Sequence, residues 1–491
     1  MRGDASILVP VVLYLALMYG LALWTNRRLS RADNFLEEYF IGGRTMGGLV
    51  LAMTLVATYT SASSFIGGPG VAYTMGLGWV LLAMIQLPTA WLTLGVLGKR
   101  FAIIGRRIGA VNVNDFLWAR YRSRAVVFCG SLSLVLFFVA AMVAQFIGGA
   151  RLFESLTGLD YRLGLALFAL SVVLYTTVGG FRAVALTDTV QGFVMIVGTV
   201  AILWGTIRAG GGLTPIMETL RQTDPALLTP FGPKDFISRP FILSFWVLVC
   251  FAVIGLPHTA VRCMGYRDSR SMHRAILIGT FVMGFLMLGM HLCGVFGRAV
   301  LPGLPSGDSI MPEITLRVLP PLWAGLFLAG PLAAIMSTVD SQLLLASATL
   351  VKDLFVRYGA PGEPRSIPAE KTLRRAGFAT TALLGLIVFG AALRPPSLIV
   401  WINLFAFGGL EAAFLWPLVL GLYWRRANGA GALASMITGV ATFFLLSIYV
   451  KRFLGMNVIV PTLAIALVVF VAVSLATRAP DEATLAPFWE D

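Results

Sequence analysis

An apolar run that begins near Met46 is interrupted by TYTSASSFIGGPG at residues 58–70. The first half of this stretch is rich in Ser and Thr, and the second half holds glycines and a proline, which weaken helical hydrogen bonding. Backbone groups freed from a helix cannot face lipid, so they must line a cavity or be satisfied inside a bundle of helices. The stretch therefore predicts a membrane helix that is unwound in its middle.

A second apolar run is interrupted by GLPHT at residues 255–259, where Pro257 removes a helical N–H donor. The two breaks lie in the second and seventh apolar runs of the chain, five runs apart. An odd offset makes corresponding helices run in opposite directions, as inverted repeats require, and paired broken helices then predict a substrate site near the middle of the membrane. Gly and Pro kinks that serve only packing are also common in membrane helices, and the pattern leaves both interpretations open.

The composition of the whole chain is that of a membrane protein. Hydrophobic residues make up 58% of its 491 residues, charged residues make up 12%, and the mean hydropathy is +0.86. Soluble domains carry about 25% charged residues. The charged residues here lie between apolar runs of about 20 residues, the length that crosses a hydrocarbon core. We predict an all-α membrane protein with thirteen spans, at 6–26, 46–73, 76–98, 125–154, 162–179, 188–209, 240–261, 275–300, 318–350, 376–393, 398–424, 430–450 and 457–477.

These spans give the expected organisation of the chain. The apolar segment near the start is too long for a signal peptide and lacks a small-residue cleavage site, so it is interpreted as a true span. Residues 358–370 are interpreted as a cytoplasmic linker. We expect an additional first helix and cytoplasmic loop at 1–45, a first repeat of spans 2–6 at 46–209, an external loop with a short surface helix at 210–239, a second repeat of spans 7–11 at 240–424, and two further helices with a short cytoplasmic tail at 425–491.

The distribution of charge orients the chain. Its formal net charge is +14, which could indicate a nucleic-acid partner. The Lys and Arg residues are concentrated in alternate loops, such as 99–124 and 352–375, which is the pattern of loops that stay in the cytoplasm. We therefore expect a multi-pass protein of a bacterial inner membrane, with the N-terminus in the periplasm, the C-terminus in the cytoplasm, and no nucleic-acid or obligate protein partner. Arg151 and Arg262, near span ends, are expected to anchor or pair helices, and contact with the substrate is the alternative.

No pattern in the sequence indicates catalysis. Four cysteines lie in or beside apolar spans without a C-x-x-C pair, and no nucleophile–base pair or phosphate-binding loop is present. His273 and His291 are isolated, without metal-ligand spacing, and are given no role. The chain is therefore interpreted as a transporter and not as an enzyme. A sensor module, like the transporter-like domains fused to signalling kinases, is a second alternative that the lack of a soluble extension disfavours.

Several motifs occur in an order that is specific to one family. They are Gly42–Gly48, Ser61–Gly70, Gln145–Leu152, Gly179–Arg182, Thr187–Thr189, Gly255–Arg262, Ala334–Thr338, Phe407–Glu411 and Gly421–Trp424. On these motifs the chain resembles the sodium:solute symporter family over nearly its whole length, and Ser61–Gly70 and Gly255–Arg262 are most similar to the branch that carries pantothenate. The resemblance implies a leucine-transporter-type core of two inverted five-helix repeats and sodium-driven uptake of pantothenate, a small organic anion, by alternating access. Proline, a monocarboxylate, sialic acid or a sugar is the alternative solute.

The resemblance also implies a sodium site between spans 2 and 9. The matched motifs supply the carbonyl oxygens of Ala57, Thr60 and Ala334 and the hydroxyls of Ser337 and Thr338. The last three residues stand at i, i+3 and i+4 and therefore share one face of a helix, and a hard cation such as sodium is bound by several oxygens. Because no carboxylate is included, the ion would be held moderately and released in each cycle. The alternative is that the two hydroxyls only bond to carbonyls one turn earlier in their own helix.

Three further positions bear on the sodium path. The family often carries an acid at the position of Asp188, associated with sodium movement on the inner side, but Asp188 and Gln191 also fit a capping box at a helix start. Asp340, one turn beyond Ser337, could attract the cation or be a solvated residue. Some relatives place an acid where this chain has Tyr59. A neutral residue there suits an anionic substrate.

Pantothenate presents a carboxylate, two hydroxyls, an amide and a gem-dimethyl group to its site. The N-terminus of a half-helix at a break supplies N–H donors toward a carboxylate, and Phe65, Trp79 and Phe405 would form an apolar wall. Each polar candidate also has a structural interpretation: serines beside glycine serve close packing, a glutamine joins two helices, and His258 satisfies a carbonyl freed by Pro257. The candidate substrate-binding residues are Ser61, Ser63, Ser64, Gln86, Gln145, His258, Thr259 and Glu411.

Overall fold

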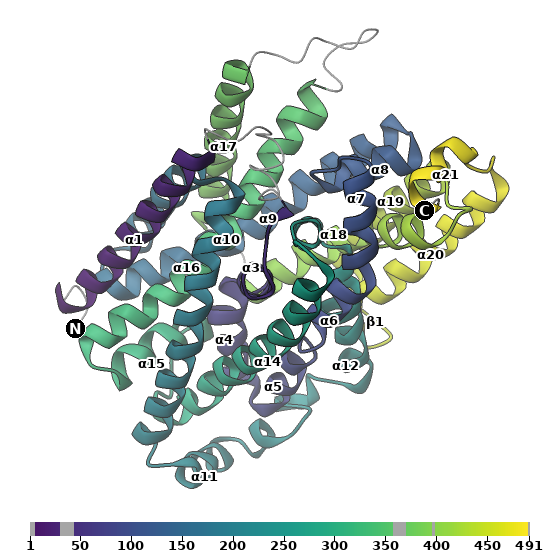
Figure 1. Cartoon of the computed structure of the whole chain (residues 1–491). Coiled ribbons are helices and arrows are strands. Elements are labelled where there is room, and N and C mark those ends of the chain that lie inside the picture. Colours follow the sequence, from purple (N-terminus) through teal and green to yellow (C-terminus); the bar gives the residue numbers. More distant parts are fainter. Residues whose placement is uncertain (1–4, 30–43, 357–369, 395–397, 490–491) are drawn as a thin grey trace.

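The computed structural model describes residues 5–29, 44–356, 370–394 and 398–489, and the chain is helical almost throughout (Figure 1). Short 3-10 and π-helical segments, labelled η, join the α-helices. The first half contains α1 (Ala5–Leu29), α3 (Gly48–Tyr59), η2 (Ser63–Gly67), α4 (Gly68–Met75), α5 (Leu77–Met84), α6 (Thr89–Leu92), η3 (Thr93–Gly98), α7 (Lys99–Arg107), α8 (Val113–Tyr121), α9 (Arg124–Thr157), α10 (Tyr161–Ala209), α11 (Leu213–Thr223), η4 (Pro225–Leu228) and η5 (Pro233–Asp235). The second half contains α12 (Arg239–Trp246), η6 (Val247–Phe251), η7 (Ala252–Gly255), α13 (Pro257–Met264), α14 (Ser269–Val300), η8 (Gly307–Ser309), α15 (Ile310–Val318), α16 (Pro321–Ala348), η9 (Thr349–Val356), α17 (Glu370–Ala392), α18 (Ile399–Tyr423), α19 (Gly429–Tyr449), the short hairpin of β1 (Arg452–Phe453) and β2 (Met456–Asn457), α20 (Ile459–Ala476) and α21 (Glu482–Trp489).

The helices are those of a membrane protein. Nine helices within the described residues are long and apolar enough to cross a membrane, and two bent pairs raise this number to eleven if each pair is one span. The spans predicted at 162–179 and 188–209 both fall in α10, which is continuous from Tyr161 to Ala209. Its two apolar parts are Tyr161–Leu174 and Ala185–Ala209. The predicted all-helical membrane fold is confirmed.

Both predicted helix breaks are present. The helix α3 ends at Tyr59, and Thr60 adopts an extended conformation with φ −76° and ψ 122°. The following helix, Ser63–Met75, is turned by 67° from α3. In the second bent pair, Leu256 is extended at φ −78° and ψ 118° just before Pro257, and the helices on either side differ in direction by 49°. Residues 60–62 are called the first break below.

The glycines after the first break were expected to unwind the helix, but they do not. Residues 63–75 are helical through η2 and α4, including the GGPG stretch at 67–70. These glycines instead allow close approach of neighbouring elements. A Cβ atom on Gly70 would lie 2.7 Å from the backbone of Gly307, and one on Gly68 would lie 2.3 Å from Nε2 of His291.

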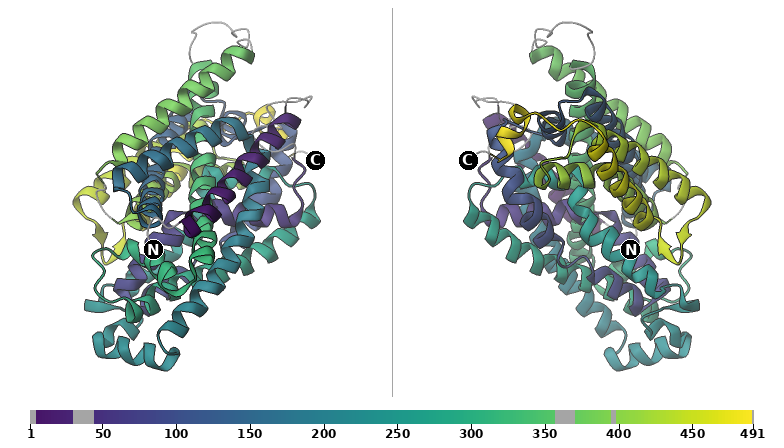
Figure 2. Two further views of the ribbon diagram at one scale, coloured as in Figure 1. Left: turned by 90° about the vertical axis from the view of Figure 1, so that its left-hand side faces the viewer. Right: turned by 90° about the vertical axis from the view of Figure 1, so that its right-hand side faces the viewer.

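The arrangement of the bundle places α3 and the first break inside. The helix α3 contacts α6, α10, α13, α14 and α16. Figure 2 shows α1 in front in its left view and α19 and α20 in front in its right view, so α1 and the α19–α20 pair flank the bundle on opposite sides. The predicted surface helix after residue 210 is α11, and the predicted tail contains α21, whose Phe488 packs edge-on against Phe116 of α8 at 5.7 Å. The predicted linker lies outside the described residues except for its last residue, Glu370.

Candidate functional site

Five oxygens that the sequence singles out converge between the end of α3 and the middle of α16. Oγ of Ser337 lies 3.4 Å from the carbonyl oxygen of Ala57 and 3.1 Å from that of Ala334. Oγ1 of Thr338 lies 3.4 Å from the carbonyl oxygen of Thr60 and 2.9 Å from that of Ala334. We call these five oxygens the oxygen cage. All of its residues are buried.

The first break explains why these oxygens are available. The last carbonyls of a helix have no intrahelical partner and carry partial negative charge, and α3 ends at Tyr59. On α16, the hydroxyls of Ser337 and Thr338 donate to Ala334, as the alternative interpretation expected. A hydroxyl that donates one hydrogen bond keeps two acceptor lone pairs. The two interpretations are therefore compatible, because a hydroxyl can bond within α16 and still present a lone pair toward α3.

A buried ion pair lies close to the oxygen cage. Asp188 accepts a hydrogen bond from Oγ1 of Thr54 at 2.6 Å, and its Oδ2 lies 3.7 Å from Nη2 of Arg262. The same guanidinium group donates to Oγ of Ser341 at 2.8 Å and to the carbonyl of His258 at 3.1 Å. The expectation that Arg262 pairs helices is confirmed. The capping-box interpretation of Asp188 is wrong, because α10 continues through this position.

Asp340 is the second acid in this region. Its Oδ1 accepts a hydrogen bond from Oγ1 of Thr176, and its side chain is buried. The alternative in which Asp340 is a solvated residue is therefore wrong. Asp340 lies one turn beyond Ser337 on α16, so an acid of α16 follows the cage within one helical turn.

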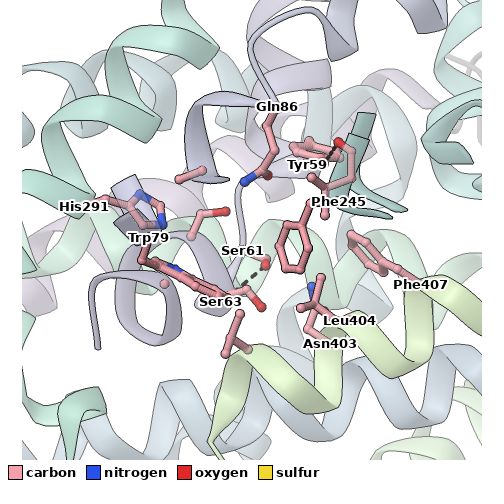
Figure 3. A pocket seen from close by; sticks show the side chains of 15 residues that line it. Tyr59, Ser61, Ser63, Trp79, Gln86, Phe245, His291, Asn403, Leu404 and Phe407 are labelled. Carbon is pink, nitrogen blue, oxygen red and sulfur yellow. Dashed lines mark hydrogen bonds between the residues drawn. The ribbon is translucent and has the colours of Figure 1, made fainter. Parts of the chain in front are cut away.

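A cavity lies on the other side of the first break (Figure 3). About 520 Å³ of space free of atoms lies between its lining residues, and this figure includes space that is open to solvent. Within the described part of the chain, no Lys, Arg, Asp or Glu lines it. Polar and aromatic side chains form most of its wall, namely Ser61, Ser63, Ser64, Gln86, His291, Asn403, Tyr59, Trp79, Phe245 and Phe407.

The structure brings half of the predicted substrate-binding residues to this cavity. One serine of the first break, two serines that follow it and one glutamine of the loop after α5 line it, namely Ser61, Ser63, Ser64 and Gln86. Trp79 of the predicted apolar wall also lines it, whereas Phe65 and Phe405 do not. Gln145 lies behind the wall, where its Oε1 accepts from the N–H of Ala62 at 2.8 Å.

The remaining predicted residues lie near the second bent pair and do not line the cavity. Oγ1 of Thr259 lies 2.7 Å from the carbonyl oxygen of Leu256 and 3.4 Å from that of Val253, the carbonyl that Pro257 leaves without an i+4 donor. The ring of His258 packs between Phe138 and Phe407, and neither of its nitrogens has a hydrogen-bond partner among the described residues. Glu411 is also buried away from the cavity. The interpretation of His258 as a partner for a freed carbonyl is wrong.

Two polar residues that line the cavity were not among the predicted substrate-binding residues. His291 of α14 has its Nδ1 2.7 Å from the carbonyl oxygen of Met287. A carbonyl only accepts, so Nδ1 carries the hydrogen, and in the neutral ring Nε2 is an acceptor at the cavity wall. Asn403 of α18 is the other group. A polar side chain inside an apolar span is a functional candidate by default, and that signal could have found both.

Known proteins similar to this chain are membrane transporters. The sodium:solute symporter family matches residues 39–439. The sodium/pantothenate symporter of Escherichia coli (strain K12) is 54% identical over 465 residues, 95% of each chain, and that of Haemophilus influenzae is 50% identical over 467 residues, 95% of this chain and 96% of the relative. A solved Na+-coupled sialic acid symporter in a substrate-bound outward-open state shares the fold, with a TM-score of 0.79 at 18% identity over 98% of this chain and 100% of that one.

Proposed function

The chain belongs to the sodium:solute symporter family, and we propose that it couples sodium entry to the uptake of pantothenate across a bacterial inner membrane by alternating access. The high identity to two sodium/pantothenate symporters over nearly the whole chain supports this solute. No covalent chemistry is involved, and the protein acts as a transporter.

One observation carries the proposal: the oxygen cage and the cavity share the first break. The carbonyl of Thr60 belongs to the cage, while the flanking residues Tyr59 and Ser61 line the cavity. A cation bound by carbonyls of α3 and hydroxyls of α16 would hold these helices together and fix the conformation of the break. The cavity wall next to it would then be shaped for the solute only when the ion is present. This arrangement supports coupled transport.

The sodium ion is proposed to bind in the oxygen cage, held by Ala57, Thr60, Ala334, Ser337 and Thr338. Uncharged oxygens suit a hard cation that must leave in every cycle. Asp188 is proposed to act on the inner part of the sodium path. Its burial next to the cage, with Arg262 as its counter-ion, supports this role.

Thirteen spans are proposed for the whole chain. The nine long helices, the two bent pairs and the two shorter apolar helices Ala5–Leu21 and Tyr161–Leu174 together agree with this number. The 49 residues of α10 support its division into two spans, since a straight helix of that length would be about 74 Å long and the hydrocarbon core is about 30 Å thick.

The two bent pairs support a core of two inverted repeats, at residues 46–209 and 240–424. Residues 1–45 and 425–491 would add helices before and after this core, and 210–239 would be the external loop. The end of the bundle that carries α8 and α21 is proposed to face the cytoplasm, because its loops hold many of the Lys and Arg residues. The N-terminus would then be periplasmic and the C-terminus cytoplasmic.

The chemistry of the cavity suits pantothenate. A neutral lining repels no carboxylate, and an amino acid such as proline would leave its ammonium group without an acid among the described lining residues. Hydroxyl and amide groups can donate to the carboxylate, and Nε2 of His291 can accept from a hydroxyl of the solute. Trp79 and Phe245, whose rings meet edge-on at 5.6 Å, supply an apolar surface for the gem-dimethyl group.

Uptake by the purified protein in liposomes tests the proposal. With an inward sodium gradient, labelled pantothenate should accumulate above its external concentration, and replacing sodium by choline should abolish accumulation. Unlabelled proline, sialic acid, a sugar and a monocarboxylate should compete poorly. Accumulation that ignores the sodium gradient would exclude the coupling, whereas strong competition by another solute would exclude pantothenate as the main substrate.

Gly68→Ala should weaken pantothenate binding through His291. The new Cβ would lie 2.3 Å from Nε2 of His291 and 2.9 Å from the carbonyl oxygen of Ser63, so the imidazole must move out of its place in the cavity wall. We expect KM for uptake to rise about tenfold or more, in line with the loss of one hydrogen bond from a buried group. Gly95→Ala is the matched control, since nothing lies within 4 Å of a Cβ there. Equal KM values for both variants would show that His291 does not contribute to pantothenate binding.

A pH-dependent contact is expected on the external side, where Asp308 joins η8 to α18. Oδ2 of Asp308 accepts from the N–H of Ile399 at 3.3 Å. Burial raises the pKa of Asp308 to about 6, although the Ile399 N–H and Arg151 act in the opposite direction. A raised pKa means that the closed contact favours the protonated acid. Its extra stability is complete below the ordinary pKa of about 4 and is lost as the pH rises through about 6.

Hydrogen exchange measured by mass spectrometry checks this dependence. Exchange of residues 305–310 should speed up between pH 5 and pH 7, after correction for the intrinsic pH effect with a peptide from α11. Asp308→Asn should remove the change while leaving the α11 peptide as it is. The same pH dependence in the Asp308→Asn variant would contradict the assignment.

A further inference from the structure

We propose that Asn403 recognises the carboxylate of the solute, and that Gln145 orients the Asn403 amide for this task. The inference deepens the proposed function and rests on it, because it takes the solute to be an organic anion. Its evidence is a relay of three groups that runs from the first break, through α9, to the cavity wall on α18.

The first step of the relay fixes the amide of Gln145. This side chain is fully buried, and its Oε1 lies 2.8 Å from the backbone nitrogen of Ala62. A backbone N–H can only donate, so the atom of Gln145 that meets it must be the oxygen. The NH2 group of Gln145 is therefore turned away from the break, toward α18.

The second step fixes the amide of Asn403. Nε2 of Gln145 lies 3.4 Å from Oδ1 of Asn403. An NH2 group can only donate, so it selects the oxygen of Asn403 and leaves Nδ2 at the other end. In Figure 3 the nitrogen of Asn403 points from the lower wall into the space beside Ser61, Phe245 and Phe407. The relay thus presents an N–H donor to the cavity.

Several backbone donors near the first break are already in use. The N–H of Ala62 bonds to Gln145, the N–H of Ser63 lies 3.2 Å from Oγ of Ser61, and the N–H of Phe65 bonds to the carbonyl of Ser61. The expectation that backbone N–H groups of this half-helix meet the anion therefore does not hold for these three. Side chains supply further donors, and Oγ of Ser63 has no partner among the described residues. It can act beside Nδ2 of Asn403.

The relay also joins anion recognition to the sodium site. Ala62 lies two residues after Thr60, whose carbonyl belongs to the oxygen cage. If the first break changes conformation when the ion leaves, the N–H of Ala62 moves away from Gln145. The amide of Gln145 is then free to turn, and Asn403 loses the contact that orients it. Release of sodium would in this way weaken the hold on the carboxylate.

A comparison of two ligands tests the inference. Pantothenate carries the carboxylate, and panthenol carries a neutral CH2OH group in its place, so the ratio of their inhibition constants reports on carboxylate recognition alone. Sodium-driven uptake of pantothenate by the unaltered protein is measured first, and its absence would be a failure of the proposed function. An unaltered protein that binds both ligands equally would overturn the role of Asn403 and leave sodium coupling intact.

Two variants change the relay at different points. Asn403→Asp replaces the NH2 donor by a carboxylate and leaves the bond between Ala62 and Gln145 in place. Gln145→Glu offers only acceptors, so the unchanged Asn403 must turn its NH2 group away from the cavity to meet it. Both should weaken pantothenate binding by about 10- to 100-fold, the range for a hydrogen bond to a charged group, and panthenol binding by less than about threefold. Gln145→Met, which adds no charge, should give a smaller loss that is still selective for the acid.

Leu404→Ala is the matched control, because it alters the same wall without removing a donor. It should weaken the acid and the alcohol alike. The inference is overturned if the Asn403 and Gln145 variants also weaken both ligands alike, or if they weaken neither. Should Gln145→Glu not fold, as judged by its thermal unfolding, Asn403→Asp decides the matter alone.

Discussion

Thr338→Ala is expected to raise the sodium concentration for half-maximal pantothenate uptake by about 10- to 100-fold. The variant removes one of the oxygens of the cage and leaves the carbonyl of Thr60, 3.4 Å away, without that neighbour. Losing one interaction with a charged group weakens binding by about 1.5–3 kcal/mol, which corresponds to this range of concentrations. Ser337→Ala should have the same effect for the same reason. Uptake measured over a series of sodium concentrations checks both.

Ser347→Ala is the matched control for these variants. It removes a hydroxyl from the same helix, but Oγ of Ser347 donates to the carbonyl of Gly377 at 3.1 Å, away from the cage. Its sodium activation should be that of the unaltered protein. If sodium activation is also unchanged in both Ser337→Ala and Thr338→Ala, the oxygen cage is not the sodium site.

Asp188→Asn is expected to abolish uptake and to destabilise the protein by about 3–5 kcal/mol. The change removes the carboxylate that neutralises Arg262, and both side chains are almost completely inaccessible to solvent. Adding Arg262→Gln to the same chain also removes the buried cation. We therefore expect the double variant to recover most of the lost thermal stability, measured by unfolding of the purified protein in detergent.

The double variant also separates two roles of Asp188. If it regains stability but still transports no solute, Asp188 acts on the sodium ion itself, as proposed. If it regains both, Asp188 serves only to neutralise Arg262. Glu218→Gln is the control, since it breaks an exposed pair with Arg221, and such pairs contribute little to stability. An Asp188→Asn variant as stable as the original would contradict the importance of the buried pair.

Local features of the sequence predicted the broken helices, and the resemblance to the family predicted the oxygen cage. Pro257 and the polar run before residue 64 each interrupt the helix in which they lie. These interruptions can therefore be predicted without knowing the rest of the fold. The spacing of Ala334, Ser337 and Thr338 likewise places them on one helix face. The resemblance to the family then supplied the neighbouring helix, and the distances of 3.4 Å between α3 and α16 agree with it.

Features that depend on contacts between distant segments could not be predicted in this way. Asp188 and Gln191 match a capping box, but the sequence cannot reveal that the helix continues through them or that Arg262 approaches from α13. His258 and Glu411 are polar groups in apolar surroundings, yet packing directs them away from the cavity. His291 reaches the cavity only because a glycine on α4 leaves room for its ring.

Equilibrium binding of labelled pantothenate to the purified protein, at sodium concentrations from zero to saturation, tests most directly whether an ion at the first break prepares the solute cavity. We predict that the dissociation constant falls as sodium rises, that pantothenate strengthens sodium binding by the same factor because coupling is reciprocal, and that Thr338→Ala moves the fall to higher sodium. One dissociation constant at every sodium concentration would contradict the account.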